Sequence, residues 1–127
     1  MKSYINERVE AFEQGVTMEL VWTNASPTSA FSAQVINLDL SEYDLIKILF
    51  KGWAQYEYSI FEMEVAKNSK GRLGAPMDYN WNRDVATTNS SIIFATAKGY
   101  GTYGKTTTVD NDQACVPIAI YGIKGVK

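Results

Sequence analysis

After residue 16, the sequence is divided into short segments in which apolar and polar residues alternate, with turn residues between them. Residues 33–40 show the pattern, because Ile36, Leu38 and Leu40 alternate with polar side chains. A period of two places the apolar side chains on one face of a β-strand. About seven to eight such segments predict an all-β fold, an antiparallel β-sandwich or jelly roll.

Other segments predict strands on the same grounds. These are residues 18–23, 45–51, 56–65, 91–97, 106–109 and 115–120. The dense apolar run at 45–51 predicts a central strand covered on both faces. In 56–65 the apolar parity changes between Ile60 and Phe61, which predicts a bulge or a strand that changes sheets. In 115–120 we expect Val116, Ile118 and Ile120 on one face.

The first 16 residues differ from the rest and predict a short helix or linker ahead of a β-sandwich domain at 17–127. Ile5, Val9 and Phe12 recur at helical spacing, and Gly15 ends the pattern. Such a short helix is marginal alone, so it must pack on the domain or on the same helix of a neighbouring chain.

Composition excludes several classes of function. The chain has no histidine and one cysteine, Cys115, which excludes Ser-His-Asp and Cys-His nucleophile systems and any intrachain disulfide. The net charge of −2 gives no positive field for nucleic acid. No apolar run approaches the length of a membrane span, and no signal peptide is evident. We expect Cys115 to be a buried, inert thiol.

Residues 99–106, GYGTYGKT, match the phosphate-binding pattern G-x-x-x-x-G-K-[ST]. That pattern binds phosphate only when a helix begins directly after the glycines. Here Thr107, Thr108 and Val109 follow, which favour a strand. The glycines therefore predict a tight β-connection, and no nucleotide or other cofactor is expected.

Residues 66–90 are polar and turn-rich, and we expect a loop at 77–84 within them. Asp78, Asn80 and Asn82 match the first three ligand positions of an EF-hand calcium-binding loop. Arg83, however, occupies the sixth position, where that loop requires glycine. No metal site is therefore predicted.

The same loop has the composition of a saccharide-binding surface, in which aromatic rings stack on sugars and amides bind hydroxyl groups. The candidate ligand-binding residues are Tyr79, Asn80, Trp81, Asn82 and Arg83, with Tyr100 and Tyr103 as a second aromatic patch. The alternative is that the tryptophan packs over the end of the sandwich.

Glu62 and Glu64 lie on one face of a predicted strand. Paired carboxylates can act as acid and base in a polysaccharide hydrolase. The simpler interpretation is the solvated face of an amphipathic strand, and no enzymatic activity is predicted.

Three segments resemble a known family. They are LVWTNASPTSAFSAQ at 20–34, LDLSEYD at 38–44 and IAIYGIKG at 118–125. Similar segments occur in β-rich domains of tail-fibre, baseplate or appendage proteins from phages and prophages of Gram-positive and gut bacteria.

The resemblance implies a virion component, made in the cytoplasm of the bacterial host, that recognises the host surface through its glycans. It also implies a homotrimer that contacts other virion proteins, for which Ile5, Val9 and Phe12 would form the seam. It supplies no catalytic residues. Two alternatives stay open: a purely structural head-fibre, baseplate or connector protein, and a jelly-roll hydrolase acting through Glu62 and Glu64.

Overall fold

The computed structural model describes residues 17–55, 60–76, 80–100 and 108–125. Within these ranges the chain is all-β, with ten strands in two antiparallel sheets and no helix, as the alternating pattern predicted. The expected N-terminal helix, with Ile5, Val9 and Phe12, lies outside the described residues.

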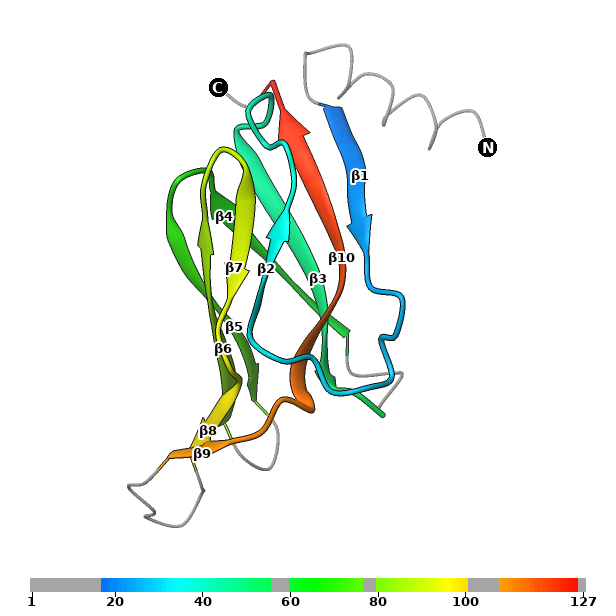
Figure 1. Cartoon of the computed structure of the whole chain (residues 1–127), viewed down its shortest axis with the longest axis vertical. Coiled ribbons are helices and arrows are strands. Elements are labelled where there is room, and N and C mark those ends of the chain that lie inside the picture. Colours follow the sequence, from blue (N-terminus) through cyan, green and yellow to red (C-terminus); the bar gives the residue numbers. More distant parts are fainter. Residues whose placement is uncertain (1–16, 56–59, 77–79, 101–107, 126–127) are drawn as a thin grey trace.

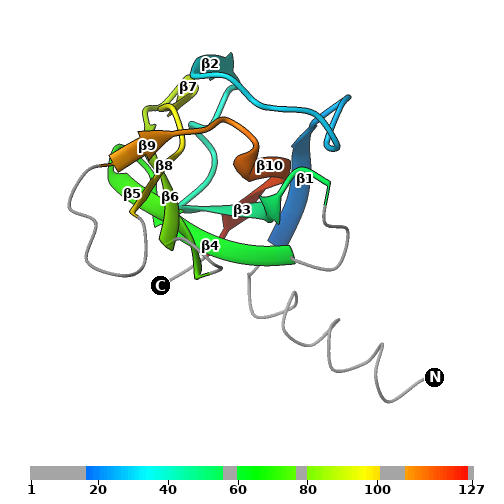
Figure 2. The ribbon, with the colours of Figure 1, turned by 90° about the horizontal axis from the view of Figure 1, so that it is seen from below.

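The two sheets face each other as a sandwich (Figures 1 and 2). Sheet 1 has the strand order β1 (Thr17–Thr23), β10 (Ala114–Lys124), β3 (Leu45–Trp53) and β4 (Ile60–Ala66). Sheet 2 has the order β2 (Gln34–Asn37), β7 (Ser91–Phe94), β6 (Asn80–Thr87), β8 (Lys98–Tyr100) and β9 (Thr108–Asp110), and β5 (Lys70–Pro76) pairs with β6. One edge of β6 is therefore paired with β5, and the other is shared by β7 and β8.

The core lies between the sheets and consists of alternate residues of their strands. In β3, Ile46, Ile48 and Phe50 point into it, and Ile92 and Phe94 of β7 are buried on the side of sheet 2. The remaining positions of β3 from 45 to 49 are only half-buried, so the expected cover on both faces of this strand is incomplete. The inward residues of β4 are Phe61, Met63 and Val65, as their parity predicted.

Strand β10 contains a β-bulge that overturns one expectation. Its register with β3 shifts between Pro117 and Ala119, so no residue of β3 lies opposite Ile118. Val116, Ile118 and Ile120 therefore do not share one face, because an extra residue reverses the side-chain alternation. Asn24 binds the bulge, since its Nδ2 donates to the carbonyl of Pro117 and its backbone N–H to that of Ile118, both at 2.8 Å.

The expected turn-rich region at 66–90 is instead a hairpin of two long strands, β5 and β6. The expected loop at 77–84 is wrong for residues 80–84, which lie in β6. Arg83 and Thr87 occupy buried positions of this strand. Polar side chains at inward positions hide the period of two on which the strand prediction depends.

The three segments at 20–34, 38–44 and 118–125 meet in the structure. Asn24 of the first segment binds the third, as described above. Tyr43 of the second packs its ring on Gly122 of the third, and the backbone N–H of Gly125 donates to the Asp44 carboxylate at 2.9 Å. Phe31 of the first segment is buried against Phe94. These segments therefore build the scaffold.

The contact between Tyr43 and Gly122 gives a stability prediction. A Cβ atom on Gly122 would lie 2.5 Å from ring carbons of the buried Tyr43. We expect Gly122→Ala to lower the free energy of unfolding by about 1–3 kcal/mol, because the core is overpacked. The measurement is urea denaturation followed by tryptophan fluorescence.

Gly74→Ala is the matched control, because a Cβ atom there meets no other atom within 4 Å. We expect this variant to be as stable as the parent or more stable by about 0.5–1 kcal/mol. Equal midpoints for the two variants would contradict the packing of Tyr43 on Gly122.

Candidate functional site

Arg83, predicted to contact ligand, points from β6 into the protein and is fully buried. Its Nε donates to the carbonyl of Cys115 at 2.9 Å, its Nη1 to that of Ala95 at 2.8 Å, and its Nη2 to that of Ala114 at 3.0 Å. The Asp112 carboxylate lies 3.5 Å from Nη1. Burial lowers the pKa of Arg83, and the charge of Asp112 opposes this shift. Arg83 therefore holds the fold together and is inaccessible to a ligand.

Trp81 also points inward and is 8% exposed. Its ring centroid lies 5.4 Å from that of Trp53, and its six-membered ring packs on the backbone of Gly99. The ring is consequently not presented for stacking on a sugar. Of the two interpretations of this tryptophan, the structure supports packing within the sandwich.

Asn80 and Asn82 alternate along β6 with the inward residues Trp81 and Arg83, so they lie on the outer face of sheet 2. Asn80 is exposed there and Asn82 is half-buried. Tyr100 ends β8 and pairs with Asn80 in the register. Tyr79 and Tyr103 lie outside the described residues. Of the five residues predicted at 79–83, the structure therefore leaves the two amides as surface candidates.

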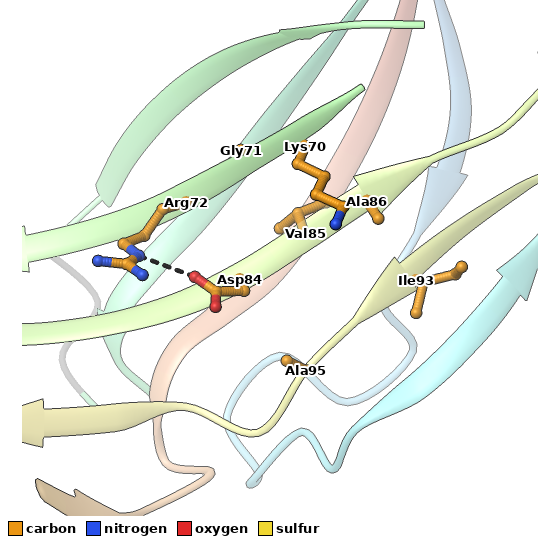
Figure 3. A pocket seen from close by; sticks show the side chains of 8 residues that line it. All are labelled: Lys70, Gly71, Arg72, Asp84, Val85, Ala86, Ile93 and Ala95. Atoms are coloured by element: carbon orange, nitrogen blue, oxygen red, sulfur yellow. Dashed lines mark hydrogen bonds and ion pairs between the residues drawn. The ribbon is translucent and has the colours of Figure 1, made fainter. Parts of the chain in front are cut away.

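A cavity of about 520 Å³ opens on this outer face, over β5, β6 and β7 (Figure 3). A volume of this order fits a small ligand. The lining residues are Lys70, Gly71, Arg72, Asp84, Val85, Ala86, Ile93 and Ala95.

The polar centre of the cavity is an ion pair between Arg72 and Asp84, which are opposite each other in the β5–β6 register. Arg72 Nε donates to Asp84 Oδ1 at 2.8 Å, and the two side chains are 63% and 60% exposed. An exposed pair of this kind adds little to stability. Ile93 and Ala95 provide an apolar side to the same cavity (Figure 3).

No local pattern in the sequence indicates this cavity. Arg72 and Asp84 are twelve residues apart, and only the hairpin register brings them together. The sequence pattern predicts aromatic binding residues, whereas the cavity is lined by an ion pair, Lys70 and small or aliphatic side chains.

A smaller cavity of about 340 Å³ is lined by Gly74, Ala75, Asn80, Trp81 and Asn82. Gly74 pairs with Asn82, and each lies two residues along its strand from Arg72 or Asp84, so all four are on the outer face of sheet 2. The second cavity therefore opens on the same face as the first.

Glu62 and Glu64 lie on the outer face of sheet 1, on the other side of the sandwich. Glu62 is 61% exposed, and its Oε2 lies 3.5 Å from Nζ of Lys47. This exposed, partly neutralised arrangement is what a solvated strand face would show. Nothing in it favours a hydrolase.

Cys115 is buried, as predicted. Burial raises the pKa of its thiol to about 12, and the positive charge of Arg83 opposes this shift. The thiol is therefore protonated at neutral pH, which makes it a poor nucleophile.

In the described ranges, no cluster of three or more cysteine or acidic side chains could ligate a metal ion. The same ranges hold no helix long and apolar enough to cross a membrane.

No protein-family model, curated protein or solved structure matches the chain.

The burial of Arg83 predicts a large loss of stability in Arg83→Met. This variant removes the side-chain donors to the carbonyl oxygens of Ala95, Ala114 and Cys115, and it removes the cation beside the Asp112 carboxylate. We expect the free energy of unfolding to fall by at least about 3 kcal/mol. Urea denaturation of the purified variant measures it.

Arg72→Met is the control, because it also removes an arginine from sheet 2, but from an exposed pair. We expect a change within about 1 kcal/mol. A comparable loss in both variants would show that Arg83 does not have the structural role assigned to it.

Proposed function

We propose that this protein is a non-enzymatic component of a phage virion, a tail-fibre or receptor-binding module that binds polysaccharide on the host cell surface. Two lines support the proposal. The three segments that resemble phage appendage domains assemble into one scaffold, and β5, β6 and β7 form a cavity with both polar and apolar side chains on the outer face of sheet 2.

The observation that carries the proposal is the Arg72–Asp84 pair beside the apolar side chains of Ile93 and Ala95. A guanidinium group donates hydrogen bonds and a carboxylate accepts them, so together they match neighbouring hydroxyl groups of a sugar. The apolar side chains match the C–H face of the same ring. A polar pair next to a small apolar surface is therefore chemically complementary to a saccharide.

One observation favours the alternative of a purely structural virion protein. Met18 and Leu20 on β1 are 37% and 55% exposed, and within the described chain β1 pairs only with β10. Exposed apolar side chains on an edge strand suit contact with another protein. A structural protein would bind other virion proteins and would not bind cells or glycans.

The glycan proposal predicts that Asp84→Asn weakens binding about tenfold or more, because a charged acceptor is lost without a change in size. The probe is a panel of purified cell-wall polysaccharides from Gram-positive bacteria, with titration of those that the parent protein binds. Absence of binding to the whole panel and to intact cells would support the structural alternative.

Glu62→Gln is the matched control on the opposite sheet. We expect unchanged polysaccharide binding in this variant and no release of reducing ends by the parent protein. Release of reducing ends that disappears in Glu62→Gln would instead establish the hydrolase alternative.

A homotrimer is part of the same proposal, with Ile5, Val9 and Phe12 as its seam. We expect light scattering behind a sizing column to give the mass of a trimer for the whole chain. A version that begins at Thr17 should give a monomer, because it lacks the seam. A monomeric whole chain would contradict the proposed assembly.

A further inference from the structure

The two cavities on the outer face of sheet 2 lie along one strand. The outward residues of β6 are, in order, Asn80, Asn82, Asp84 and Ala86, and the inward residues between them are buried. Asp84 and Ala86 line the larger cavity, and Asn80 and Asn82 line the smaller one. Because Asn82 and Asp84 are consecutive outward positions, the two cavities are neighbours on one continuous strand face.

On the β5 side, two long charged side chains and then a glycine flank this row. Lys70 and Arg72 stand beside the larger cavity, and Gly74 stands beside Asn82 at the smaller one. A Cβ atom on Gly74 would meet no other atom within 4 Å. The space over Gly74 is therefore open, and a ligand that extends from the larger cavity meets no side chain of residue 74.

We infer that the outer face of β6 binds a linear saccharide chain of several units, which runs along the strand from the cavity at Asp84 to the cavity at Asn80. The inference rests on the proposed glycan-binding function and adds the form of the ligand. The structure assigns Asn80, Asn82 and Asp84 as the residues that contact successive units.

The spacing of the polar groups supports a repeating ligand. Alternate residues of a strand are about 7 Å apart, so the polar row from Asp84 to Asn80 spans about 14 Å. That length exceeds one sugar ring. Each amide offers both a donor and an acceptor, and Asp84 offers acceptors, so hydroxyl groups can be bound at every step of the row.

The same chemistry disfavours a folded protein as the ligand of this face. The centres of protein interfaces are depleted in charged residues and enriched in large apolar and aromatic ones. Here the central row consists of two amides and a carboxylate, and the exposed apolar side chains of Ile93 and Val35 lie to one side of it, in β7 and β2.

The test measures affinity as a function of chain length. A polysaccharide that the protein binds is partially hydrolysed, and fragments from monosaccharide to hexasaccharide are titrated by calorimetry against the whole chain. We expect affinity to rise about tenfold or more from the shortest bound fragment to the longer ones, and then to stop rising.

The discriminating variant is Gly74→Leu, which places a side chain over the smaller cavity without disturbing the core. We expect it to unfold at the same urea concentration as the parent or at a higher one. It should bind the shortest fragments like the parent and lose the gain in affinity for the longer ones. Gly74→Ala, with a much smaller side chain, is the control that should retain most of the gain.

The outcomes separate this inference from the proposed function. If the parent binds no saccharide of any length, the proposed function fails. If it binds saccharide with an affinity independent of length, or if Gly74→Leu behaves like the parent, the function stands and the extended site is overturned. Loss of binding at every length in a folded Gly74→Leu would also overturn it, because the cavity at Asp84 would then not bind by itself.

Discussion

The hydrogen bonds of the buried Arg83 guanidinium group are the contacts on which the packing of the two sheets depends. It extends from β6 of sheet 2 and binds carbonyl oxygens at the end of β7 and at the start of β10 in sheet 1. Its carbon Cζ also lies 5.3 Å from the centre of the Phe31 ring. A charge in a protein interior is costly unless hydrogen bonds satisfy it. Arg83 meets this condition with donors directed at separate chain segments, in a chain that has no disulfide bond.

The backbone conformation at Cys115 accompanies the hydrogen bonds to Arg83. Cys115 has a φ of 48°, in the left-handed region that a side chain of this kind seldom adopts. The resulting bend lets the carbonyls of Ala114 and Cys115 both accept hydrogen bonds from Arg83. The local strain is thus offset by contacts between the sheets, and β10 continues from this point across the centre of sheet 1.

The orientation of β6 follows from the same interaction. With Trp81 and Arg83 directed into the protein, the period of two leaves Asn80, Asn82 and Asp84 on the outer face. The segments at 20–34, 38–44 and 118–125 contribute mainly to the core and its edges: Phe31 packs beside Arg83, and Tyr43 covers Gly122. These three segments thus belong to the scaffold, while the candidate binding surface comes mainly from the β5–β6 hairpin, which lies outside them.

The sequence by itself determined the all-β class and the inward residues of β4, because both depend on the local alternation of apolar residues. The burial of Cys115 followed from the residue type, since a free cysteine in an apolar strand is usually buried. It did not reveal the β5–β6 hairpin, since Arg83 occupies a core position and breaks that alternation. Only the tertiary structure decided the bulge at Ile118, the inward direction of Trp81, and the pairing of Arg72 with Asp84. These features depend on strand register and on contacts between residues far apart in the chain, which no local pattern encodes.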